Sequence, residues 1–104
     1  MKKEIFNIAI QKEIGSDIPA IFQIEGKLLS ENSIVDGVNF IVHRMVMLDK
    51  TISNKDWVVA ELESGHCVCI GKTQKKAIAE AQKICKKVGT EKVLDTIKNL
   101  TKVN

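Results

Sequence analysis

The stretch WVVAELESGHCVCIGKTQKKAIAEAQKICKKV, residues 57–88, decides the fold. It begins with two short apolar runs, at 57–62 and 66–70, in which β-branched side chains are frequent. Glu63, Ser64 and Gly65 separate the runs by the length of a tight turn. The pattern is typical of a β-hairpin, so we predict two antiparallel strands here.

The remainder of this stretch predicts a helix over 73–88. Thr73 is a residue type that caps helices well, and Gly89 is a typical helix stop. Between them, apolar residues recur at the i, i+3, i+4 spacing of one helix face. After Gly89, Thr90 is expected to cap a second, terminal helix over 90–102.

The first 56 residues are predicted to be rich in strands. Phe6, Ile8 and Ile10 alternate with less apolar residues, the period of a half-buried strand. A second strand is expected over 20–28, with Gly26 as a possible bulge.

The segment 38–48 is less clear. Asp36-Gly37 before it is a strong two-residue turn signal. The apolar run that follows fits either a strand or a buried helix. We favour the strand because β-branched and aromatic residues dominate its start. The polar residues Asn54-Lys55-Asp56 are read as the end of the next loop.

The chain is 104 residues long, which is enough for one domain and one core. Within that domain a strand-rich half, residues 1–56, is followed by the β-β-α unit 57–88 and the helix 90–102. We therefore predict an α+β fold, an antiparallel sheet of four or five strands with one face covered by the 73–88 helix, plus a C-terminal helix.

Positive charge is concentrated in the second half. Residues 1–54 carry a net charge of −1, whereas residues 55–104 carry +4. The excess lies on the outer face and ends of the predicted 73–88 helix, with Glu80 as the only acid among Lys72, Lys75, Lys76, Lys83, Lys86 and Lys87. These lysines are our candidate contacts to a protein partner or to nucleic-acid phosphates. The alternative is a solvent-exposed helix face that binds nothing. Trp57, at the start of its strand, is a possible anchor residue.

The chain shows no pattern of an enzyme. It has no Gly-rich phosphate loop and no zinc-protease or Ser-hydrolase motif, and only two histidines, His43 and His66. We therefore expect no catalytic residues and no cofactor. With three cysteines, an odd number, and no targeting or membrane-spanning segment in the sequence, we expect a cytoplasmic protein without a disulfide framework.

The three cysteines raise the question of a metal. Cys67 and Cys69 are two residues apart on a strand, so both thiols are expected on one face, and Cys85 lies on the apolar helix face. If these faces coincide, three thiols converge as a zinc site requires. Buried structural cysteines are the favoured interpretation, since zinc pairs usually come from turns.

The order strand, Gly turn, strand, then Gly71-Lys72-Thr73 opening a helix with Ala77 and Ala81, resembles the β-β-α module of HicB-type antitoxins and of similar small phage and prophage proteins. The resemblance covers residues 57–88, about a third of the chain. It implies a protein that binds a partner and is not itself a catalyst. The family usually has acidic residues where Lys75 and Lys76 stand.

Together these patterns favour a small non-enzymatic protein that acts by occupying a macromolecular partner, such as an antitoxin-like protein or a phage-type inhibitor of host defence. A protein partner is the first expectation, and a homo-oligomer through a sheet edge or the terminal helix is possible. The alternative is a nucleic-acid-binding module that uses the lysine face. A double-stranded-RNA-binding domain also has a β-hairpin followed by a helix that begins with lysines. It is only a minor alternative here, because Ile78 stands where that family has a lysine.

Overall fold

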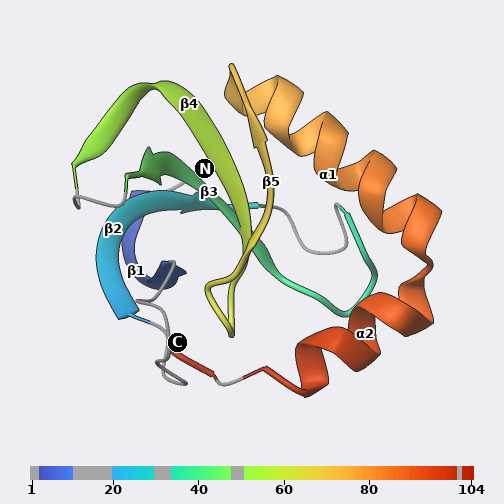
Figure 1. Cartoon of the computed structure of the whole chain (residues 1–104). Helices are drawn as coiled ribbons and strands as arrows, with labels where there is room; N and C mark the ends of the chain where they lie inside the picture. The colour runs from blue at the N-terminus through green and yellow to red at the C-terminus, as the bar shows by residue number, and fades with distance from the viewer. Residues whose placement is uncertain (1–2, 11–19, 30–33, 48–50, 101) are drawn as a thin grey trace.

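The computed structural model describes residues 3–10, 20–29, 34–47, 51–100 and 102–104. Its elements are β1 (Lys3–Ile10), β2 (Ala20–Leu28), β3 (Phe40–Val46), β4 (Ile52–Glu61), β5 (Cys67–Gly71), α1 (Gln74–Val88) and α2 (Thr90–Lys98). The strands form one antiparallel sheet in the order β1-β2-β3-β4-β5, and α1 packs on β3, β4 and β5 (Figure 1). The predicted α+β fold, with a covering helix and a C-terminal helix, is confirmed.

The ambiguous segment 38–48 contains a strand and not a helix. In β3, Val42 lies opposite Val59 of β4, and Ile41 lies opposite Ala60. The side chains of Phe40, Ile41 and Val42 are all buried although neighbours in a strand point to opposite faces. A strand covered on both faces is apolar throughout, and this is why periodicity could not separate it from a buried helix.

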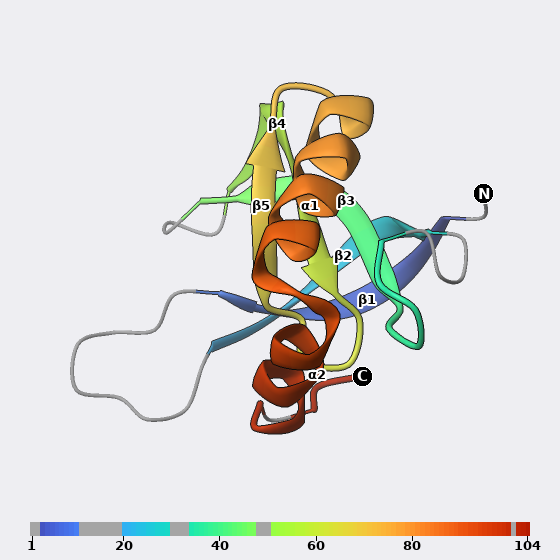
Figure 2. The same ribbon diagram turned by 90° about the vertical axis from the view of Figure 1, so that its right-hand side faces the viewer.

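Two separate cores cover the two faces of the sheet. On the helix side, Val42 and Val59 pack against Ala77 and Ala81 of α1. On the opposite face no helix is needed, because the sheet curls until β1 and β2 cover β3 and β4. Figure 2 shows β1 and β2 crossing β4 and β5, and this second core is made by Phe6, Ile8, Ile24, Ile41, Val58 and Ala60. The sequence predicted the first core but not the second.

The curled sheet closes where β1 meets the β4–β5 turn. The Ala9 N–H donates to the Gly65 carbonyl at 3.0 Å. A Cβ on Gly65 would lie 2.7 Å from the Cα of Ile8, and Gly65 has φ +68°, so both space and backbone angle require glycine.

Hydrogen bonds from Asn104 hold β1 against the region where β4 ends. The Asn104 side chain accepts a hydrogen bond from the Asn7 N–H at 2.9 Å and donates to the Asn7 carbonyl at 2.7 Å. The same amide group also donates to the Leu62 carbonyl at 2.6 Å. One side chain therefore joins β1 to the end of β4.

The helix ends follow the predicted capping chemistry in α1 but not in α2. Thr73 Oγ1 accepts from the Lys76 N–H at 3.1 Å, and Gly89, with φ +97°, donates from its N–H to the Cys85 carbonyl. The prediction that Thr90 caps the second helix is wrong. Gly89 occupies the cap position with no side-chain hydrogen bond, and Thr90 is already in α2.

Two further local predictions are wrong. Gly26 is not a bulge, since it pairs regularly with Glu4 and His43. Glycine is needed there for space, because a Cβ would lie 2.9 Å from the Val42 carbonyl oxygen. Residues 54–56 are not loop but part of β4, which starts at Ile52.

The first half of β4 is irregular. Its pairing with β3 passes from Val46–Ile52 directly to Arg44–Trp57, and in the stretch between, Ser53 Oγ accepts hydrogen bonds from the backbone N–H groups of Lys55 and Asp56. The turn at Asp36-Gly37 is as predicted, with the Val38 N–H donating to the Val35 carbonyl. Among the described helices, none is both long and apolar enough to cross a membrane.

Candidate partner-binding surface

The lysine-bearing helix is held directly against the sheet. Ala77 and Ala81 are fully buried, and a Cβ on Gly71 would lie 2.6 Å from the Ala77 nitrogen. The Cys69 thiol donates a hydrogen bond to the Ala77 carbonyl at 3.0 Å. Small residues on both elements thus bring α1 into close contact with β5, and its outer face is a fixed surface.

The six lysines predicted from the sequence all lie exposed in the structure, on α1 and just before it. At 100° per residue, Lys76, Lys83 and Lys87 share one flank of the helix with Glu80, while Lys75 and Lys86 lie on the other flank. We call these six residues the lysine surface: Lys72, Lys75, Lys76, Lys83, Lys86 and Lys87.

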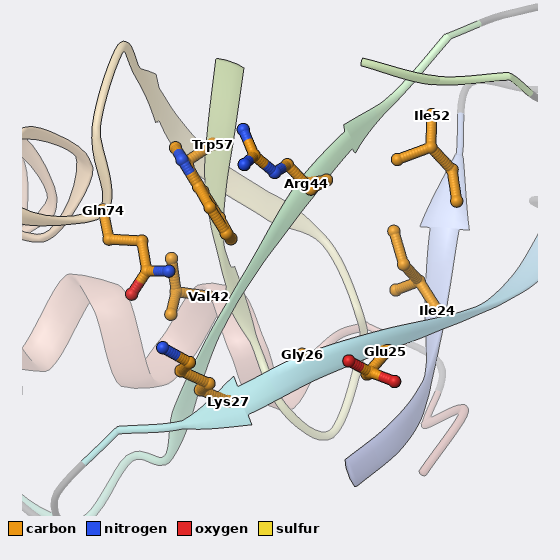
Figure 3. A pocket seen from close by; sticks show the side chains of 9 residues that line it. All are labelled: Ile24, Glu25, Gly26, Lys27, Val42, Arg44, Ile52, Trp57 and Gln74. Carbon is orange, nitrogen blue, oxygen red and sulfur yellow. The ribbon is translucent and has the colours of Figure 1, made fainter. Parts of the chain in front are cut away.

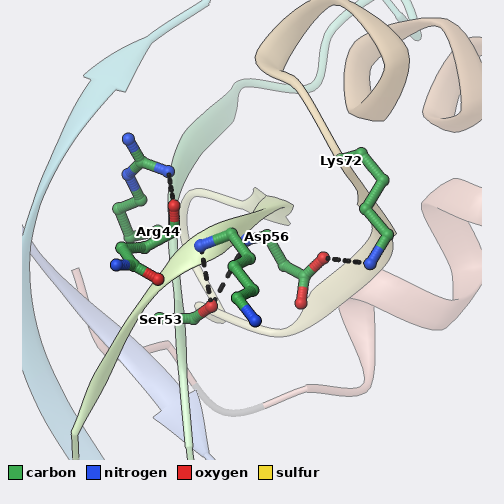
Figure 4. Close-up of polar contacts among 6 residues, drawn as sticks. Arg44, Ser53, Asp56 and Lys72 are labelled. Carbon is green, nitrogen blue, oxygen red and sulfur yellow. Dashed lines mark hydrogen bonds and ion pairs between the residues drawn. The ribbon is translucent and has the colours of Figure 1, made fainter.

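Only Lys72 of this surface forms an ion pair within the described residues. Its Nζ lies 3.2 Å from Asp56 Oδ1, and Figure 4 shows this pair beside the Ser53 hydrogen bonds of β4. Lys75 and Lys76 stand in the first turn of α1, where the helix dipole is positive and no acid balances them. Within the described part of the chain, most lysines of this surface therefore have no ion-pair partner.

Trp57, the possible anchor, is half-buried in the structure. Its ring is partly buried against the helix-side core, and the Arg44 guanidinium lies 3.9 Å from the ring centroid. Arg44 is held in place by donating to the Asn54 carbonyl at 3.1 Å. The stack makes Trp57 one wall of a cleft.

That cleft, of about 320 Å³, lies between β2, β3, β4 and the start of α1 (Figure 3). Figure 3 shows Lys27 and Gln74 pointing toward each other across it, with Ile24 and Ile52 at its other end. Arg44 is the chain's only arginine, and no sequence pattern places it beside Trp57. The cleft joins the N-terminal end of the lysine surface through Gln74.

The three thiols do not converge. Cys69 packs under α1 with Cys85, but Cys67 lies on the opposite face of the sheet, opposite Ala60. A register shift between Val59 and Ala60 causes this, because the extra residue in β5 breaks the alternation that the prediction assumed. Within the described residues, no group of three His, Cys, Asp or Glu side chains is placed to hold a metal ion.

The thiols are also poor nucleophiles. Burial raises the pKa of Cys69 to about 11, helped by the nearby Cys67, Glu80 and Cys85. Burial likewise raises the pKa of Cys67 and of Cys85. All three are therefore protonated at neutral pH, whereas the thiolate is the reactive form.

His43 is a buried residue of β3. Its Nδ1 lies 2.6 Å from the Arg44 carbonyl oxygen, and burial lowers the pKa of its imidazole. The neutral ring with Nδ1 as the donor fits this geometry. Among the described side chains, we find none placed to give a proton to His43.

Sequence reasoning missed an apolar groove between β1 and β5, on the face opposite α1. Its volume is about 450 Å³, and it is lined by Ile8, Ala9, His43, Met45, Val46, Met47, Val58, Gly65, Cys67 and Ile70. Ile70 is 48 % exposed and Met47 43 % exposed. The groove exists because the sheet curls, and a single strand pattern carries no signal of that curvature.

Comparison of the chain with protein-family models, with curated proteins and with solved structures gives no match. The function is therefore argued from the surfaces described above.

Proposed function

We propose that this is a non-enzymatic binding protein that acts by occupying a macromolecular partner, with the lysine surface as its main contact. The observation that carries the proposal is the rigid presentation of that surface. Five of its six lysines have no ion pair within the described residues, and close packing of Ala77 and Ala81 fixes the helix on which they stand. Such a surface speeds and orients association with an acidic partner.

The chemistry of the described side chains supports a binding role over a catalytic one. The imidazole of His43 is buried and neutral, and the thiols of Cys67, Cys69 and Cys85 are protonated at neutral pH. The likeness of residues 57–88 to antitoxins and small phage proteins favours a partner from a toxin–antitoxin or host-defence system.

Nucleic acid is the second candidate, favoured by one specific observation. Lys72, Lys75 and Lys76 cluster at the N-terminal end of α1, where the helix dipole adds to their positive charge. Phosphates bind at such places, and each phosphate contact gives salt-dependent affinity.

One titration separates the two candidates. Fluorescence anisotropy would measure binding of labelled duplex DNA, single-stranded DNA, RNA and poly-L-glutamate at low salt and at about 0.15 M salt. An acidic protein partner predicts binding of poly-L-glutamate that is lost in the variant Lys75→Glu, Lys76→Glu, Lys83→Glu. Nucleic-acid binding that persists at the higher salt and is lost in this variant would favour the second candidate. Equal binding by the variant and the wild type would refute both.

A further inference from the structure

The two edge strands of the sheet are protected differently. Along β1, the Asn7 N–H and carbonyl both bond to the Asn104 side chain, and the Ala9 N–H bonds to Gly65. Within the described residues, β5 pairs with β4 alone. Among the residues that the structure describes, one edge is therefore partly capped, while nothing pairs with the outer edge of β5.

The open edge also lacks the features that usually prevent strand addition. Natural edge strands commonly carry lysine, proline or inward-pointing charges. The five residues of β5, CVCIG, include no charge and no proline. Its exposed Ile70 faces the apolar groove, beside Cys67. A strand that paired with β5 would place every second side chain in this groove.

The helix side of the same edge is basic. Gln74 of α1 lines the cleft with Val42 of β3, and the flank of Lys75 and Lys86 follows Gln74 round the helix, so the Glu80 flank lies on the β5 side. Lys76, Lys83 and Lys87 are four residues before Glu80 and three and seven residues after it, which places them on this flank. Figure 2 shows α1 lying over β5, with β3 on the far side of β4. Three lysines and one glutamate thus border the open edge.

We propose that the outer edge of β5 binds an extended segment of a partner protein in which apolar residues alternate with aspartate or glutamate. Backbone hydrogen bonds to β5 would supply affinity, the groove would hold the apolar side chains, and the Lys76 flank would pair with the acidic ones. The inference rests on the proposed function and specifies the partner's chemistry. A second copy fits less well, because two-fold pairing of β5 would bring the lysines of two α1 helices together.

The test is a nuclear magnetic resonance titration of the ¹⁵N-labelled full chain with an acetylated, amidated ten-residue peptide of alternating Val and Glu. Saturable shift changes at residues 67–71 and at Lys76, Lys83 and Lys87 are expected. The same peptide with Lys for Glu should give none. Absence of saturable shifts, or shifts confined to other strands, would overturn the proposal.

Matched variants locate the contact. Ile70→Asp should abolish peptide binding, while Ile21→Asp, at a site of similar exposure on β2, should leave it unchanged. Lys76→Glu, Lys83→Glu and Lys87→Glu together should weaken binding about tenfold, whereas Lys75→Glu with Lys86→Glu on the other flank should have a much smaller effect. Circular dichroism would confirm that each variant is folded.

The outcomes also separate this inference from the proposed function. If the peptide fails to bind while poly-L-glutamate still binds through the lysine surface, strand addition is refuted and the binding function stands. If sedimentation shows a dimer that Ile70→Asp dissociates, the edge is a contact between copies and the partner proposed here is wrong. If the wild-type protein binds neither the peptide nor poly-L-glutamate, both proposals are refuted.

Discussion

Replacing Gly71 by alanine should loosen α1 from the sheet. The new Cβ would lie 2.6 Å from the Ala77 nitrogen and 2.8 Å from its Cα, while ordinary contacts begin at 3.4 Å. Both atoms belong to the backbone, so no side chain can rotate away. The helix and β5 must separate by about 0.8 Å to relieve the contact.

The cost follows from what that separation loses. A gap of about 0.5–1 Å forfeits a quarter to a half of the dispersion attraction between packed atoms. It would affect the fully buried Ala77 and Ala81, and it would stretch the hydrogen bond from Cys69 to Ala77. We expect Gly71→Ala to lower the free energy of unfolding by about 2–3 kcal/mol, within the usual range for overpacking. That is a large share of the roughly 5–15 kcal/mol of a typical domain.

Urea unfolding followed by circular dichroism measures this loss, and Trp57 fluorescence reports on the residue paired with Gly71. Gly37→Ala is the control, because nothing lies within 4 Å of its new Cβ. Gly37→Ala should lower the free energy of unfolding by only about 1 kcal/mol, the cost of placing alanine at a positive φ of +81°. A loss for Gly71→Ala below about 0.5 kcal/mol, or below that of the control, would show that the close contact does not hold α1 in place.

Three further predictions concern buried groups. Burial lowers the pKa of His43 below 6.5, so the folded protein binds fewer protons than the unfolded chain, and stability should fall as pH drops below about 6.5. In His43→Gln, the free energy of unfolding should depend less on pH between about pH 7.5 and 5.5. An unchanged pH dependence would contradict this. Glu61→Gln should cost about 1–3 kcal/mol in urea unfolding, because the buried carboxylate accepts from two backbone N–H groups, whereas the exposed Glu63→Gln should cost under about 0.5 kcal/mol. In native protein at pH 7.5, a thiol reagent should modify Cys67 slowly and Cys69 not at all, and rapid reaction of Cys69, measured by mass spectrometry, would contradict its burial.

Local chemistry could be predicted from the sequence, while features that depend on curvature could not. The hairpin, the Thr73 cap and the Gly89 stop depend on neighbours in sequence, and all are present. The six lysines lie on an exposed helix surface because helical periodicity placed them opposite the buried alanines.

The failures have distinct physical causes. The predicted face of Cys67 was wrong, because the one-residue register shift in β5 reverses the direction of the side chains on one side of the shift. The stacking of Arg44 on the Trp57 ring was not predicted, because it depends on the pairing of β3 with β4. The groove beside Ile70 depends on how far the sheet bends, and no single strand encodes that bend.

The Asn104 hydrogen bonds have a consequence for the order of folding during synthesis. Asn7 is made well before the side chain that satisfies its backbone groups, which lies 97 positions later. The β4–β5 hairpin and α1 contain mostly local contacts and can form as they leave the ribosome. The backbone groups of Asn7 therefore stay without this partner until Asn104 has been made, although Phe6 and Ile8 can already be buried against β2, β3 and β4.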